Sequence, residues 1–199
     1  MDIYTIPIGF NLTNCYLVKF NDNHGIVIDP ADNGDKIYNY IEEKEIIIKR
    51  IILTHGHFDH IGAVDYLRKK LDVPLSIHSL DNPLLLDPQK NLSFMSMNPI
   101  KISPADNLLE DGDIISNFEI IHTAGHTPGG ITLYNKENKV LFTGDTIFKN
   151  SYGRTDFPGA NQETLFNSIE NLLKLDGDIT IYPGHGPKTS IGEFKQFFY

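Results

Sequence analysis

The stretch Thr54-His55-Gly56-His57-Phe58-Asp59-His60 decides the fold of this sequence, because it places three imidazoles and one carboxylate within six residues. It directly follows the apolar run Ile51-Ile52-Leu53 and therefore lies at the end of a predicted buried strand. Imidazole and carboxylate are the ligands that divalent metals such as zinc prefer. Core packing does not explain three histidines on one loop, since they would repel one another if protonated. The stretch therefore predicts a metal-binding loop.

Three further strand-like runs are each followed by a candidate metal ligand, either a histidine or an aspartate. Each run is followed by a glycine and then, within the same turn, by His126, Asp145 or His185. Glycine permits the sharp turn that aims a side chain at a strand end into a shared cleft. The candidate metal ligands are therefore His55, His57, Asp59, His60, His126, Asp145 and His185.

This set of ligands indicates two ions rather than one, because seven groups exceed the four of a closed structural zinc site. Asp145 has two carboxylate oxygens and is the natural bridge. The expected ligands are, for one ion, His55, His57 and His126, and for the other, Asp59, His60 and His185. Two ions about 3.5–4 Å apart can share a water and lower its pKa toward about 7, which indicates metal-assisted hydrolysis. Asp59 and Asp145 are the candidate catalytic carboxylates.

Composition indicates an ordinary globular protein. The 199 residues, 40% hydrophobic and 22% charged, are enough for a single domain over residues 1–199. The net charge of -9 argues against nucleic-acid partners, which need clustered Lys and Arg. Cys15 is the single cysteine, so no intrachain disulfide can form. With no signal peptide and no membrane-spanning run in the sequence, we expect a cytoplasmic location and no membrane partner.

Hydrophobic periodicity predicts short strands with helices scattered among them. One helix is expected to start at Asp59, whose carboxylate would cap it, and to continue to Leu71. Residues 81–99 read as a short helix and a loop. Other helices are expected at 34–44, 162–175 and 191–199. This alternation favours an α+β domain with two mixed β-sheets and helices outside.

The pattern H-x-H-x-D-H, followed by single His, Asp and His residues up to His185, resembles the metallo-β-lactamase superfamily. The resemblance implies a four-layer αββα sandwich with the metals at one edge of the two sheets. Val27-Ile28-Asp29-Pro30 is similar to an early motif of that family, which implies that Asp29 supports the ligands through hydrogen bonds. Ala31 stands where the family usually has glycine, so the local turn is expected to differ.

The segment that follows Asp145 indicates the subfamily. Lactamases of this fold usually have cysteine where this sequence has Asp145, which argues against antibiotic hydrolysis. Residues 144–157 and 183–187 resemble the hydroxyacylglutathione hydrolase (glyoxalase II) group, in particular its short single-domain bacterial members. The resemblance implies that Arg154 holds a carboxylate of the thiol, and Lys149 and Tyr152 are further candidates for substrate contact. Full-length relatives carry an extra C-terminal helical domain that the sequence to Tyr199 does not contain.

The leading hypothesis is a thioesterase in which metal-bound hydroxide attacks a small acyl-thiol substrate. Zinc is the expected metal, and the same ligands accept iron or manganese. One alternative is a persulfide dioxygenase with Fe(II) held by His55, His126 and Asp145. Two others are a phosphodiesterase, which the acidic balance disfavours, and a metal-binding module without activity. The oligomeric state is left open.

Overall fold

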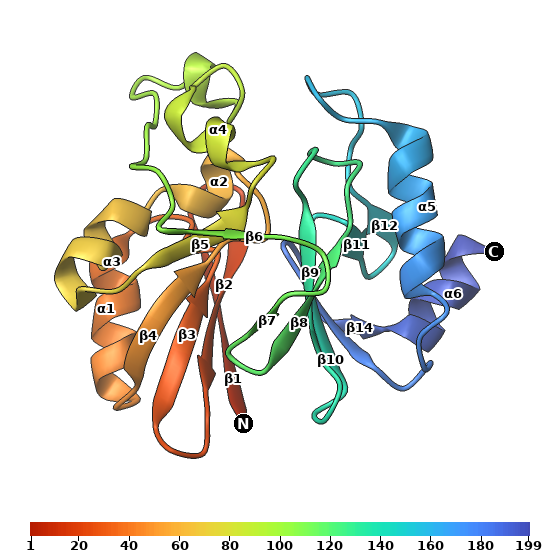
Figure 1. Cartoon of the computed structure of the whole chain (residues 1–199), viewed down its shortest axis with the longest axis horizontal. Coiled ribbons are helices and arrows are strands. Elements are labelled where there is room, and N and C mark those ends of the chain that lie inside the picture. The colour runs from red at the N-terminus through yellow and green to blue at the C-terminus, as the bar shows by residue number, and fades with distance from the viewer. The chain divides into compact units, whose positions relative to one another are not determined.

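The protein is described by a computed structural model that covers the backbone of residues 1–199 and every side chain except that of Met95. The chain divides into two compact units, Met1–Leu108 and Leu109–Tyr199. Each unit is built on one six-stranded mixed sheet with helices packed on it (Figure 1). The predicted α+β class with two mixed sheets flanked by helices is confirmed. The prediction of one domain over residues 1–199 stays a prediction.

The sheet of the first unit has the order β1-β2-β3-β4-β5-β6. Its strands are β1 (Asp2–Ile8), β2 (Thr13–Lys19), β3 (His24–Ile28), β4 (Ile47–Ile52), β5 (Leu75–His78) and β6 (Asn107–Leu109), the last of which crosses the boundary between the units. The helices are α1 (Gly34–Glu43), α2 (Phe58–Ile61), α3 (Val64–Leu71) and α4 (Asn82–Leu86), with a 3-10 turn at Ser93–Met95.

Strand direction brings three loops to one edge of this sheet. The strands β3, β4 and β5 are parallel neighbours, so their carboxyl ends meet at the same edge. The helices α1 and α3 bury Ile37 and Leu67 in the core that also holds Val27 and Ile51 of the sheet. The residues that follow β3, β4 and β5 are therefore placed side by side by a rigid scaffold.

The sheet of the second unit has the order β14-β13-β10-β9-β8-β7. Its strands are β7 (Ile114–Ile115), β8 (Phe118–His122), β9 (Ile131–Asn135), β10 (Val140–Gly144), β13 (Thr180–Pro183) and β14 (Thr189–Ser190). A separate hairpin consists of β11 (Ile147–Phe148) and β12 (Ser151–Tyr152). The helices are α5 (Gln162–Leu172) and α6 (Ile191–Phe198), which lie on the same side of the sheet in Figure 1.

Three strands of the second sheet also run in one direction. The strand β10 is parallel to β13. Both β10 and β8 pair antiparallel with β9, so β8 runs in the same direction as β10 and β13. The helix α5 makes the crossover from β10 to β13 and packs Leu165 and Ile169 against Leu141 and Ile181 of the sheet. The loops after β8, β10 and β13 therefore leave the same edge.

The prediction of one continuous helix from Asp59 to Leu71 is wrong. The helix is broken into α2 and α3 at Gly62, where an added Cβ would lie 2.3 Å from the carbonyl oxygen of Ala31. The expected cap is also wrong, because His57 is the N-cap residue and Asp59 lies in the first turn. This close passage of two backbones interrupts the helix. The predicted C-terminal end of α5 at residue 175 is also wrong, since this helix ends at Leu172.

Among the described residues, no helix is long and apolar enough to cross a membrane. The cytoplasmic location stays a prediction.

Candidate metal centre

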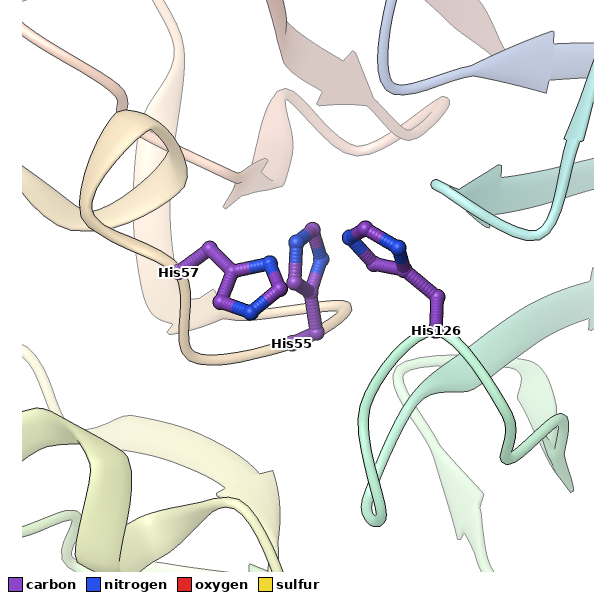
Figure 2. Close-up of side chains that lie close together, drawn as sticks. All are labelled: His55, His57 and His126. Atoms are coloured by element: carbon purple, nitrogen blue, oxygen red, sulfur yellow. The ribbon is translucent and has the colours of Figure 1, made fainter. Parts of the chain in front are cut away.

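Four predicted ligands lie on the loop and short helix after β4. Figure 2 shows the imidazoles of His55 and His57 on this loop. The ring centroid of His55 lies 4.8 Å from that of His57 and 4.1 Å from that of His60. All three rings are buried. Three buried imidazoles at such distances would repel one another if protonated, and neutral imidazole is the form that binds metals.

Asp29, at the end of β3, organises this loop from one side. Its carboxylate accepts hydrogen bonds from the Thr54 backbone N–H at 2.8 Å and from the Thr54 hydroxyl at 2.6 Å. It also lies 2.9 Å from Nδ1 of His60. Asp29 is buried and has a left-handed backbone with φ 50°. Asp29 therefore contacts His60, one of the predicted ligands.

These contacts determine which imidazole nitrogen is available to a metal. Asp29 can only accept, so Nδ1 of His60 carries the proton and Nε2 carries the lone pair. The Thr54 hydroxyl uses its hydrogen to donate a hydrogen bond to Asp29. In the 3.1 Å contact between the Thr54 oxygen and His55 Nδ1, the imidazole N–H is therefore the donor. One carboxylate therefore sets the same tautomer in two predicted ligands, in which Nε2 is the nitrogen that carries the lone pair.

Asp81, which is not among the site residues predicted from the sequence, supports the same loop from the other side. It follows β5, is fully buried, and its Oδ2 accepts the Gly56 backbone N–H at 3.0 Å. Gly56 also packs closely on α4, since a Cβ there would lie 2.7 Å from Leu84 Cβ. Because β3 and β5 flank β4, buried carboxylates that follow both neighbouring strands hold the segment that carries His55 and His57.

Asp59 has a different environment from the histidines beside it. Its side chain is only partly buried. Its Oδ2 accepts a hydrogen bond of 2.8 Å from the side-chain amide of Asn11, on the turn between β1 and β2. Asn11 is not among the site residues predicted from the sequence.

The second unit carries the other three predicted ligands. The Oδ2 atom of Asp145 lies 3.6 Å from Nε2 of His126 and 3.5 Å from Nε2 of His185. Two ligands of one tetrahedral ion, each about 2.0–2.1 Å from it, are separated by roughly 3.3–3.4 Å. This oxygen is therefore at the distance expected if it shares an ion with each imidazole, as a bridging carboxylate would.

Backbone contacts fix the orientation of His126, which Figure 2 shows on the loop after β8. Its Nδ1 lies 2.8 Å from the carbonyl oxygen of Arg154 and must donate to it, so Nε2 is the lone-pair nitrogen. The chain can pass this closely because residue 153 is glycine, where a Cβ would lie 2.0 Å from the Asp145 carbonyl oxygen and 3.1 Å from His126 Nδ1. On the other side, Gly125 abuts the backbone of Leu165 on α5.

The predicted substrate residues lie on or after the β11–β12 hairpin, and all have exposed side chains. Arg154 forms a bidentate pair with Asp156, at 2.9 Å from Nε and 2.6 Å from Nη2, and lies over the ring of Phe157. This pairing holds the pKa of Asp156 below its usual value. Tyr152 packs edge-on against Phe166, and Lys149 is at the hairpin turn. Substrate binding by these three residues stays a prediction.

Comparisons of the sequence and the structure with known proteins agree on one family. A family model described as the metallo-beta-lactamase superfamily matches residues 8–185. A probable metallo-hydrolase of Bacillus subtilis, YqgX, is 40% identical over 94% of this chain and 90% of its own. The hydroxyacylglutathione hydrolase GloC of Haemophilus influenzae is 37% identical over 98% of this chain and 96% of its own.

Two solved structures have the same fold. The one described as BLEG-1 B3 metallo-beta-lactamase is 35% identical, with a TM-score of 0.93 over 98% of this chain and 97% of the other. The one described as TTHA1623 in a di-iron-bound form is also 35% identical, with a TM-score of 0.90 over 98% of both chains. The fold implied by the sequence resemblance is therefore confirmed.

Proposed function

Because this chain is a metallo-hydrolase that belongs to the metallo-beta-lactamase superfamily, we propose that it hydrolyses small acyl-thiol esters at a two-metal centre. The observation that carries the proposal is the position of Asp145 Oδ2, at 3.5–3.6 Å from the Nε2 atoms of two imidazoles. A carboxylate in this place can bridge two hard or borderline ions. A cysteine thiolate there would favour a different set of metals and reactions.

The proposal assigns each predicted ligand to one ion. The first ion would be held by His55, His57 and His126, whose side chains Figure 2 draws, and the second by Asp59, His60 and His185. Asp145 would bridge them. The donor set fits zinc, iron or manganese, and a relative with 35% identity is described in a di-iron-bound form. We take zinc as the expected ion and iron as the first alternative.

Bound ions in this position supply Lewis acidity for a carbonyl oxygen and lower the pKa of water near it. The chain contributes the fixed orientation of the ligands. Asp29 keeps His55 and His60 in the tautomer that presents Nε2, and the Arg154 carbonyl does the same for His126. Because the tautomer of these three imidazoles is set by the chain itself, their contacts would preorganise the centre for charge that develops on the substrate.

Thiol esters suit this arrangement because their leaving group needs little help. Water adds to the acyl carbon and the C–S bond breaks, so the products are a carboxylate and a thiolate, and the two protons of the water pass to solvent. Thiols have a pKa of about 8.5, so the departing sulfur does not require a dedicated general acid. The exposed guanidinium of Arg154 could exchange its pairing with Asp156 for a carboxylate of the thiol carrier, which offers the same bidentate geometry.

The experiment measures hydrolysis of S-lactoylglutathione by zinc-loaded protein, and the release of free thiol is the readout. We expect turnover that is abolished by a chelator, restored by zinc, and lost in Asp145→Ala. Failure to hydrolyse any acyl-thiol in protein shown to contain two ions would refute the proposal.

A second candidate is β-lactam hydrolysis, because a relative with 35% identity and a TM-score of 0.93 is described as a B3 metallo-beta-lactamase. The same preparation can be assayed with a chromogenic cephalosporin. A kcat/KM higher for the cephalosporin than for every acyl-thiol tested would favour this candidate.

A further inference from the structure

The turn between β1 and β2 makes a specific contact with one predicted ligand. Asn11 lies 48 positions before Asp59 in the sequence, and its Nδ2 donates a 2.8 Å hydrogen bond to Asp59 Oδ2. A carboxylate can only accept, so the amide nitrogen rather than the amide oxygen must face Asp59. The contact is charge-assisted, which makes it stronger than a hydrogen bond between neutral groups.

The position of Asn11 is set by the hairpin that carries it. The pairing of Ile8 with Thr13 closes the turn, and the Leu12 N–H donates to the Gly9 carbonyl at 3.3 Å. The residues on either side of Asn11 are turned to solvent, since Phe10 is 101% and Leu12 63% exposed. Among these three neighbours, Asn11 is the residue whose side chain is directed at the candidate metal centre.

Asp59 needs such a partner because it borders a space that water can enter. A pocket of about 200 Å³ adjoins it, with Phe58, Ile100 and Phe10 in its wall. A partly buried carboxylate beside such a space can rotate about its terminal bond. A hydrogen bond to one oxygen fixes that rotation and so determines how the carboxylate faces an ion.

We propose that Asn11 is a positioning residue for the second metal ion, acting through Asp59 and not by binding the ion itself. The inference rests on the proposed two-metal function. It predicts that the affinity of one ion depends on the tip of the β1–β2 hairpin and that the affinity of the other does not. The hydrogen bond of Asp29 to His60 supports the same ion by another route, so loss of Asn11 should weaken the site and not abolish it.

The test is a zinc titration against a chromophoric chelator, which yields two dissociation constants. Asp59→Ala identifies the constant that belongs to the second ion. Asn11→Leu, similar in size but without a donor, should raise that constant at least about tenfold and leave the other within about twofold. Asn11→Gln, which keeps an amide N–H, should recover part of the loss. Leu12→Ala, on the same turn but outside the wall of this pocket, is the matched control and should change neither constant.

Unchanged constants in Asn11→Leu, or equal weakening of both ions, would overturn the inference. Asn11→Ala carries the same prediction should leucine at the tip prevent folding, which thermal melting would reveal. Hydrolysis of S-lactoylglutathione by the wild-type protein is measured in parallel. A selective zinc effect without hydrolysis would keep the inference and remove the proposed substrate, whereas hydrolysis without a selective effect would do the reverse.

Discussion

The carboxylate of Asp29 lies 2.9 Å from Nδ1 of His60, and both side chains are almost completely buried. The same carboxylate accepts hydrogen bonds from the backbone N–H and the hydroxyl of Thr54. The oxygen of that hydroxyl in turn contacts Nδ1 of His55. A single acidic group at the end of β3 therefore controls two imidazoles on the loop after β4. Asp29 therefore orients two predicted ligands of the proposed metal centre without being a ligand itself.

Replacing Asp29 with asparagine should weaken metal binding by roughly 10–100-fold, the usual effect of removing a partner of a metal ligand. The amide has one acceptor oxygen for three donors, and its NH₂ group faces N–H and O–H protons. Asp22→Asn is the matched control, because Asp22 lies at the same 2.9 Å from a histidine, His24, but is exposed. Zinc titration checks both variants, and equal affinities in the two would contradict the role of Asp29.

Gly125→Ala should displace the loop that carries His126. Gly125 has φ +134°, and a Cβ there would lie 2.3 Å from backbone atoms of Leu165. We expect a loss of stability of about 2–5 kcal/mol, from strain and overpacking together, with loss of zinc binding. Gly112→Ala separates the two causes, because Gly112 also has a positive φ, +82°, but open space around it.

Gly112→Ala should cost only about 1–2 kcal/mol and leave zinc binding intact. Denaturant unfolding and zinc titration of both variants provide the measurement. Intact zinc binding in Gly125→Ala would show that His126 does not depend on this close packing.

Arg154→Ala should raise KM for S-lactoylglutathione by roughly tenfold or more, with little change in kcat, because a charged contact to the thiol carrier is lost. Its side chain is exposed and paired with Asp156 on the surface, so the melting temperature should not change. An acyl-thiol without a carboxylate, such as an N-acetylcysteamine ester, provides the control substrate. A KM effect of the same size on that substrate would argue against recognition of a carboxylate.

Cys15 should be unreactive in the folded protein. Burial, and secondarily the negative charge of Asp29, raise the pKa of this thiol well above its usual value of about 8.5. Since thiolate is the reactive form, iodoacetamide at pH 8.5 should modify the unfolded chain rapidly and the folded chain very slowly.

The same raised pKa has a consequence for stability. Above pH 8.5 the unfolded state loses the thiol proton and the folded state keeps it, so this contribution to stability falls as the pH rises further. Rapid alkylation of the folded protein at pH 8.5 would contradict the buried position of Cys15.

The candidate ligands were predicted as chemically distinctive residues next to apolar strands, and Asp29 was predicted from the resemblance of residues 27–30 to an early family motif. Asp81 and Asn11 could not be predicted, because their roles depend on which strands are neighbours. Asp81 becomes meaningful only once β5 is known to flank β4, and Asn11 only once the β1–β2 turn is known to lie beside Asp59. The position of Asp81 shortly after a strand is a weak local signal, and it does not reveal which segment the carboxylate supports.

The broken helix has a similar cause. The apolar spacing from Ile61 to Leu71 is helical, and nothing in that spacing reveals that Gly62 must pass close to the Ala31 carbonyl. That restriction comes from a segment 31 positions earlier in the chain, and local periodicity does not record it.

The central claim is a pair of ions bridged by Asp145, and metal content tests it most directly. Protein loaded with zinc and desalted should contain about two zinc ions per chain by elemental analysis, and Asp145→Ala should contain one or fewer. A single ion per chain in the wild-type protein, or two ions retained in Asp145→Ala, would contradict the claim. A single iron per chain together with oxygen uptake on a thiol persulfide would favour the dioxygenase alternative instead.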